Sequence, residues 1–288
     1  MKFGAHVSIA EGIINAPKRA SAVGAEVFQI FTKSPHGGKA TPITDSLAED
    51  FRLALLEYHQ YECYVHTPYY INFASSNNRI KYGSISAVRD DLERASKLGA
   101  RYVMTHLGSA RDLGRTEALR QVGEGISKAL RNYRGTAELL LELTAGTGLI
   151  VGDTFAEMKK ILNSLSKPAQ RKCTGVCFDT CHVFASGYDL RTPAAVSRTM
   201  ANFAKELGLG KLKLFHFNDS KTELGSHRDR HEHIGQGKIG RGGFTAIINF
   251  AKEKLPEVNA IIETPYQSGK KDPRDADILT LIKLRDKK

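Results

Sequence analysis

Tryptophan is absent from this chain of 288 residues, and cysteine is scarce, with four residues. Cys173, Cys177 and Cys181 are spaced four residues apart, which does not match the Cys-x-x-Cys spacing of a structural zinc site. We therefore expect these residues and Cys63 to be reduced thiols packed around a strand, as in a cytoplasmic protein.

Long apolar runs are missing as well. No segment of the sequence approaches the roughly 18 apolar residues of a membrane-spanning helix, and residues 1–6 lack the apolar stretch of an export signal. We expect a cytoplasmic protein without membrane contact. The apolar fraction of 41% is nevertheless sufficient for a packed core.

Acidic residues are outnumbered, because 42 Lys and Arg stand against 31 Asp and Glu, a formal net charge of +11. Such an excess favours a polyanionic partner, since cations attract phosphates and release their bound counterions. A solubilising surface charge is the alternative that charge alone leaves open.

Short apolar runs alternate with helical patterns along the whole chain, which indicates βαβ units and a parallel sheet. The expected strands are 2–6, 26–31, 62–66, 101–106, 138–143, 174–179, 211–216 and 260–263. Eight strands close a barrel, and 288/8 gives 36 residues per unit. The sequence therefore predicts a single (β/α)₈ TIM-barrel domain over residues 1–288, near the usual size of about 250 residues.

Local patterns predict several helix ends. Ser46 and Glu49 have the spacing of a capping box at a helix start. Gly99 follows an amphipathic stretch and is expected to end that helix. Thr154 and Glu157 mark another helix start.

Six expected strands end in, or reach, a potential metal ligand: His66, His106, Glu142, Asp179, His216 and Glu263. All strand carboxyl ends of a parallel barrel meet at one rim, where barrel enzymes hold their active sites. Each residue alone would be an ordinary loop or cap residue, but unpaired carboxylates crowded together repel one another. Bound cations relieve that repulsion, and this mixture of donors suits Zn²⁺, Mn²⁺ or Fe²⁺.

Further donors follow two of these strands. His182 lies one turn after Asp179, and the loop 228–235 carries Asp229, His231 and His233 on one side if it is extended. A charged, solvated loop is the simpler interpretation of such a segment. Because the loop follows the His216 strand, we interpret Asp229 and His231 as ligands of a further metal with His182, which makes the site polynuclear.

Several motifs resemble the endonuclease IV family, zinc-dependent apurinic/apyrimidinic endonucleases of DNA base excision repair. They are GAHVS at 4–8, VHTPYYIN at 65–72, THLG at 105–108, ELTAG at 142–146, GVCFDTCH at 175–182, HFNDSK at 216–221, DRHEHIG at 229–235 and ETP at 263–265. They occur in the family's order over nearly the whole chain.

The resemblance implies three zinc ions. Their ligands would be His66, His106 and Glu142 for the first, Glu142, Asp179, His216 and Glu263 for the second, and His182, Asp229 and His231 for the third. It further implies that metal-activated water cleaves the phosphodiester bond 5′ to an abasic site of double-stranded DNA and leaves a 3′ hydroxyl. Glu142 and Glu263 would be the catalytic carboxylates, and cleaning of blocked 3′ ends would be a related activity of a monomeric enzyme.

The resemblance also implies that the family flips the abasic nucleotide out of the duplex. Tyr69 and Tyr70 match an inserting position, and Arg230 matches a phosphate contact. Two departures affect these expectations: Ser34–Lys39 replaces a loop that usually carries Arg and Trp, with His36 or Lys39 as weak substitutes. Leu143 replaces a usual Asn, which puts a hydrogen bond beside Glu142 in doubt.

Two other functions fit parts of the sequence. Sugar isomerases and epimerases place one or two metals at the same rim of related barrels, but the 229–235 loop and the net charge of +11 argue against this class. A damage-binding protein that has lost turnover is favoured only by the altered 34–39 loop and by Leu143.

Overall fold

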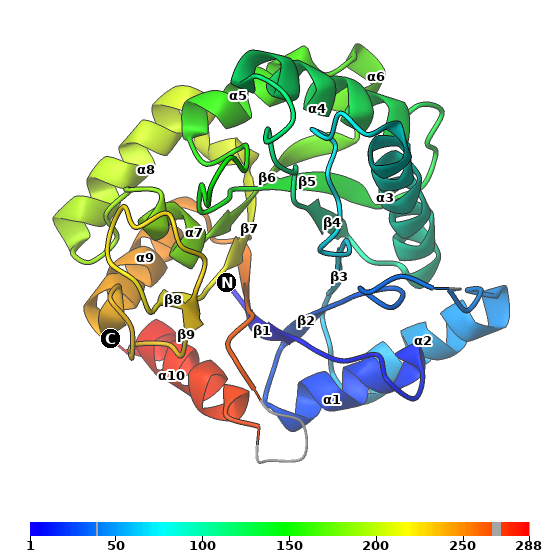
Figure 1. Cartoon of the computed structure of the whole chain (residues 1–288). Helices are drawn as coiled ribbons and strands as arrows, with labels where there is room; N and C mark the ends of the chain where they lie inside the picture. Colours follow the sequence, from blue (N-terminus) through cyan, green and yellow to red (C-terminus); the bar gives the residue numbers. More distant parts are fainter. Residues whose placement is uncertain (39, 267–271, 288) are drawn as a thin grey trace.

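Eight parallel strands close into a barrel (Figure 1). Their order around the barrel is β1-β10-β7-β6-β5-β4-β3-β2. The computed structural model describes residues 1–38, 40–266 and 272–287. The barrel strands are β1 (Phe3–His6), β2 (Val27–Ile30), β3 (Cys63–His66), β4 (Tyr102–Thr105), β5 (Glu138–Glu142), β6 (Cys173–Asp179), β7 (Leu212–His216) and β10 (Asn259–Ile262). The predicted barrel is confirmed, and its strands differ from the expected ranges mainly at their ends.

A ring of helices surrounds the barrel (Figure 1). They are α1 (Ala16–Ala22), α2 (Asp45–Glu57), α3 (Asn78–Leu98), α4 (Arg115–Ala129), α5 (Phe155–Ser164), α6 (Lys167–Gln170), α7 (Thr180–Ala185), α8 (Pro193–Leu207), α9 (Gly240–Lys254) and α10 (Arg274–Asp286), with 3₁₀ turns at Ile13–Asn15 and Leu209–Lys211. The longer helices bury one apolar stripe against the outer face of the strands, as Val88, Leu92 and Ala95 of α3 illustrate.

Of the three predicted helix ends, one is wrong and two are correct. The capping box of Ser46 and Glu49 is wrong, because Thr44 is the N-cap of α2 and its hydroxyl accepts the Leu47 N–H at 3.2 Å. Thr44 has the extended backbone that a cap requires, whereas Ser46 already lies inside the helix. Gly99 does end α3, in a left-handed conformation with φ 77°. Thr154 caps α5 by accepting the Glu157 N–H.

Besides the apolar core between the strands and the helices, a separate apolar cluster fills the inside of the barrel. Its members come from seven strands and touch one another, which only inward-pointing side chains can do: Val27, Tyr64, Tyr102, Met104, Leu140, Cys177, Leu214 and Ile261. The barrel is therefore a packed core and not a pore.

A short antiparallel pair, β8 (Asp219–Ser220) and β9 (His231–Glu232), brings the loop between them to the carboxyl ends of the strands. All four cysteines are buried free thiols, as expected. Among the described residues, no helix combines the length and apolarity needed to cross a membrane.

Candidate metal centre

One polar layer lies directly above the apolar interior of the barrel. Side chains of a strand point to the same face at every second residue, so each residue two positions after an interior residue also points inward. That step leads from Tyr64 to His66 and from Leu140 to Glu142. The complete layer is His6, Gln29, His66, His106, Glu142, Asp179, His216 and Glu263, one residue for each barrel strand. His106 and Glu263 lie one residue beyond the ends of β4 and β10.

The first group of donors contains His66, His106 and Glu142. Oε2 of Glu142 lies 2.9 Å from Nε2 of His66 and 3.4 Å from Nε2 of His106. Ligand atoms of the three residues all lie within 4.8 Å of one another, a spacing that one cation can span.

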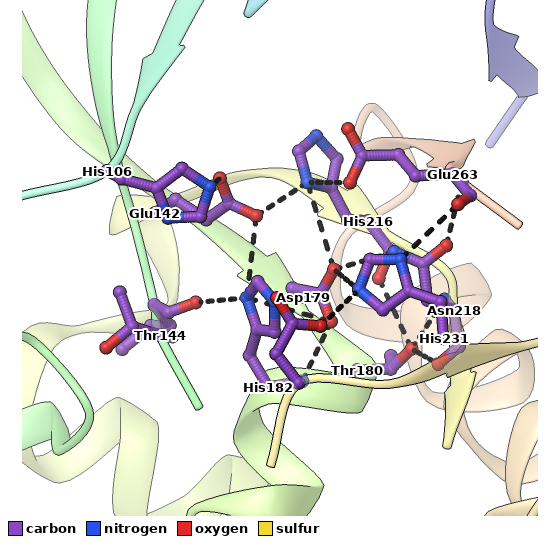
Figure 2. A network of polar contacts seen from close by, with 12 residues as sticks. His106, Glu142, Thr144, Asp179, Thr180, His182, His216, Asn218, His231 and Glu263 are labelled. Carbon is purple, nitrogen blue, oxygen red and sulfur yellow. Dashed lines mark hydrogen bonds and ion pairs between the residues drawn. The ribbon is translucent and has the colours of Figure 1, made fainter. Parts of the chain in front are cut away.

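The second group contains Glu142, Asp179, His216 and Glu263 (Figure 2). Nδ1 of His216 lies 2.8 Å from Oε1 of Glu142 and 3.3 Å from Oε2 of Glu263. The two oxygens of Glu142 thus face different groups. The buried Glu142 carboxylate is therefore shared by the first and second groups.

The third group contains His182, Asp229 and His231, and it joins α7 to the loop after β8. Nε2 of His182 lies 3.2 Å from Oδ2 of Asp229, and Nε2 of His231 lies 3.2 Å from Oδ1 of the same residue. The Asp229 side chain is 48% exposed, whereas Glu142 and Asp179 are fully buried. This group therefore contains the most exposed donor of the three groups, although His106 and Glu263 also line the cavity.

The hydrogen bonds of the histidine rings show whether these residues fit a metal. Some ring nitrogens are held by a hydrogen bond, and others have no partner. One nitrogen of each of three rings is oriented by a backbone carbonyl: Nδ1 of His66 by Thr67, Nδ1 of His182 by Leu143, and Nδ1 of His231 by Glu263. The opposite Nε2 atoms of His182 and His231 are buried and have no hydrogen-bond partner. In metal ligands, one ring nitrogen is usually oriented by a hydrogen bond, and the other is left free to bind the cation. The donor set fits bound divalent cations.

Leu143 takes part in this arrangement through its backbone. Its side chain is fully buried in the core, and its carbonyl oxygen lies 3.0 Å from Nδ1 of His182. The replacement of the usual Asn therefore leaves the orientation of His182 intact.

Electrostatics keeps the buried Glu142 carboxylate ionised. Burial alone would raise the pKa of Glu142, but the nearby His106 and His216 lower that pKa well below its ordinary value. Burial would likewise lower the pKa of His231, but the carboxylates of Asp179 and Asp229 outweigh it and raise the pKa to about 9. Without bound ions, the carboxylates and the imidazoles of the donor groups thus stabilise each other's charged forms.

Buried polar side chains hold the ligands in place. Asn218 donates to Oδ2 of Asp179 at 2.7 Å and accepts the Glu263 N–H at 2.7 Å. The buried Asp219 carboxylate accepts backbone N–H groups from residues 220, 235, 237, 239 and 240 and so anchors the end of the ligand loop. His233 belongs to none of these donor groups, and its Nδ1 lies 2.8 Å from the carboxylate of Asp277 in α10.

A cavity of about 290 Å³ opens above the ligands, and its wall includes His6, Tyr69 and Tyr266. Tyr69 and Tyr70 are 66% and 47% exposed at this rim, and Arg230 is exposed nearby. Phe31 supports Tyr69 edge to face, with ring centroids 5.2 Å apart. Of the altered loop, His36 is exposed, and Lys39 lies outside the described residues.

Sequence reasoning missed three polar residues of this site: His6, Gln29 and Asn218. Gln29 and Asn218 are fully buried, and His6 lines the cavity. The sequence does carry a usable signal, since Gln29 is the one polar residue in the apolar run of residues 27–31. His6 ends β1 just as His66 ends β3.

Comparison with known proteins defines the class first. Residues 17–285 match the family described as "Xylose isomerase-like TIM barrel". A solved structure of a D-tagatose 3-epimerase-like protein superimposes with a TM-score of 0.71 at 18% identity, covering 99% of this chain and 95% of the other.

Two further matches define the family within that class. "Probable endonuclease 4" of Halothermothrix orenii is 35% identical over 98% of this chain and 99% of its own length. The crystal structure of endonuclease IV from Thermus thermophilus has a TM-score of 0.84 at 33% identity, covering 98% of each chain. The chain belongs to the endonuclease IV family, a family of metal-dependent DNA repair phosphodiesterases, as its motifs predicted.

Proposed function

We propose that this protein hydrolyses the phosphodiester bond 5′ to abasic sites in double-stranded DNA and leaves a 3′ hydroxyl. The observation that carries the proposal is the set of three donor groups at one barrel rim, two of which share Glu142. Removal of blocked groups from 3′ ends is the same hydrolysis at a strand terminus. We further propose that the protein acts as a cytoplasmic monomer.

Three zinc ions are the proposed metals, with Mn²⁺ or Fe²⁺ as substitutes at some positions. Their ligands would be the three groups described above, with Glu142 shared between the first and second. When bound, such cations supply activated water near neutral pH and neutralise charge on the phosphoryl oxygens. Glu142 belongs to two of the groups. In the second group, Oε2 of Glu263 lies 3.3 Å from Nδ1 of His216, which also contacts Glu142. We propose that Glu263 orients and deprotonates the attacking water.

DNA recognition is proposed to use the rim of the cavity. The net charge of +11 attracts the phosphate backbone, and we propose that the exposed Arg230 contacts a phosphate. Tyr69 and Tyr70 present aromatic rings beside the metal ligands, where they can occupy the space left by a flipped abasic nucleotide.

A duplex with one tetrahydrofuran residue as a stable abasic analogue tests the proposal. We expect the zinc-loaded protein to nick only the strand with the analogue and only on its 5′ side. A DNA polymerase should then extend the new end, because it bears a 3′ hydroxyl. A zinc-loaded, folded protein that binds this duplex without cutting it would instead be a damage-binding protein.

Sugar epimerisation is the competing activity within the same fold. The epimerase-like structure is 18% identical, which supports the shared fold alone. The third group, with His182, Asp229 and His231, exceeds the one or two metals that such chemistry uses. A protein that epimerises ketohexoses and leaves abasic DNA uncut would be an epimerase.

Tyr69→Ala is expected to weaken DNA binding more than catalysis. Stacking on an aromatic ring contributes about 1–3 kcal/mol, so KM for the tetrahydrofuran duplex should rise about 10-fold while kcat changes little. Steady-state kinetics measure both constants. Tyr61→Ala is the matched control, because Tyr61 is 68% exposed but precedes the amino end of β3, away from the rim. Equal kinetics for the two variants would exclude a role of Tyr69 in substrate binding.

A further inference from the structure

Two of the eight strands contribute no proposed metal ligand to the polar layer: β1 contributes His6 and β2 contributes Gln29. Gln29 is fully buried. Burying an amide is costly unless its hydrogen bonds are made, so the partners of Gln29 show what this position does.

The Gln29 amide contacts three members of the same layer. Its Nε2 donates to Oε1 of Glu263 at 2.6 Å and to Nδ1 of His6 at 2.9 Å. Its Oε1 lies 2.9 Å from Nε2 of His216 and accepts the proton of that nitrogen. The orientation of the amide follows from these partners, because a carboxylate can only accept and an amide oxygen cannot donate.

These bonds determine which atoms face the cations. A neutral imidazole carries one proton, so His216 with a proton on Nε2 presents a free lone pair on Nδ1. That Nδ1 is the atom 2.8 Å from Glu142 and 3.3 Å from Oε2 of Glu263. Because Gln29 occupies Oε1 of Glu263, Oε2 is the oxygen left to face the same point.

Gln29 also differs from the other orienting groups of the centre. His66, His182 and His231 are oriented by backbone carbonyls, which no substitution removes. Among these four histidines, His216 alone relies on a side chain for this contact. This contact can therefore be removed by mutation.

We propose that Gln29 is a positioning residue of the second donor group, which selects Nδ1 of His216 as the ligand atom and aims Oε2 of Glu263 at the same cation. The inference rests on the proposed function, since it assumes that a cation binds there. Gln29 does not bind the cation itself, because both polar atoms of its amide are used by its neighbours.

Gln29→Met tests the proposal, because methionine keeps the length of the side chain and removes all three contacts. Loss of an orienting partner of a ligand weakens metal affinity about 10- to 100-fold. We expect a loss of that size for one class of zinc sites, measured on chelator-stripped protein by competition with a zinc indicator. At saturating zinc, kcat on the tetrahydrofuran duplex should fall while KM stays unchanged, since Gln29 is buried beneath the ligands.

Gln60→Met is the matched control. Gln60 is also buried, and its Nε2 donates to the carbonyls of Ala25 and Tyr58 before the amino ends of β2 and β3. A general loss of packing would weaken zinc binding in both variants. Equal zinc affinity in Gln29→Met and the unchanged protein would overturn the proposal.

A measurement on the unchanged protein covers the case in which Gln29→Met does not fold. In zinc-loaded protein with ¹⁵N-labelled histidine, nitrogen-15 shifts should show His216 protonated on Nε2 and bound to metal through Nδ1. The reverse assignment would refute the role of Gln29 while leaving the proposed nuclease intact. Absence of zinc binding to the unchanged protein would refute both.

Discussion

Glu142→Gln is expected to lower the rate of incision of a tetrahydrofuran duplex by about 10³-fold or more, because metal ions supply several kcal/mol of transition-state stabilisation. The amide keeps the shape of the side chain but replaces one acceptor oxygen by a donor nitrogen. One of the two faces of the Glu142 carboxylate, towards His66 or towards His216, then loses its ligand atom. Single-turnover kinetics with excess enzyme measure the chemical step.

Glu138→Gln provides the control for this substitution. Glu138 begins the same strand, β5, and accepts a hydrogen bond from the Thr174 hydroxyl at the opposite end of the barrel. It should keep the rate of the unchanged protein. Incision by Glu142→Gln within about 10-fold of that rate would mean that the bridging position is not needed for hydrolysis.

Removal of the metals is expected to abolish incision and to lower the thermal stability markedly. A ligand that binds only the folded protein stabilises it by about 4 kcal/mol at 1,000 times its dissociation constant. With an unfolding entropy of about 2.1 cal/mol/K per residue, that corresponds to a fall in Tm of about 7 °C on removal for a chain of this size. Calorimetry before and after treatment with dipicolinate measures the shift, and elemental analysis should give three zinc per chain.

Restoration is the control for the chelation experiment. Added Zn²⁺ should return both Tm and incision, whereas Mg²⁺, which prefers all-oxygen shells, should return neither. Ca²⁺, which also prefers oxygen ligands, should likewise return neither Tm nor incision. A protein that retains its Tm and its activity after complete removal of zinc would contradict the proposed metal centre.

The barrel could be predicted from the sequence because its signals are local. Buried parallel strands appear as short apolar runs, and eight such runs at similar spacing leave few alternatives. Residue types do not locate the start of α2, because Thr44 and Ser46 are both good caps by type. Only the extended backbone of Thr44 distinguishes them, and that conformation depends on how the preceding loop packs.

The donors that end a strand could be anticipated from closure of the barrel, which gathers all strand ends at one rim. Gln29 stands out as a lone amide in an apolar run, but its partners could not be anticipated, because no pattern along the chain marks them. The contact of His233 with Asp277 joins residues 44 positions apart and depends on the packing of α10. Such contacts become visible only when the helices are in place.

Closure of the barrel has a consequence for biosynthesis. The parallel pairing of Phe3 with Ala260 joins the first strand to the last, so a growing chain cannot complete the ring until β10 has left the ribosome. Pairings between such distant segments are slow to form. The donors of the first group are translated by residue 142, whereas the second needs residue 263. Its full ligand set therefore becomes available for metal capture only after nearly the entire polypeptide has been made.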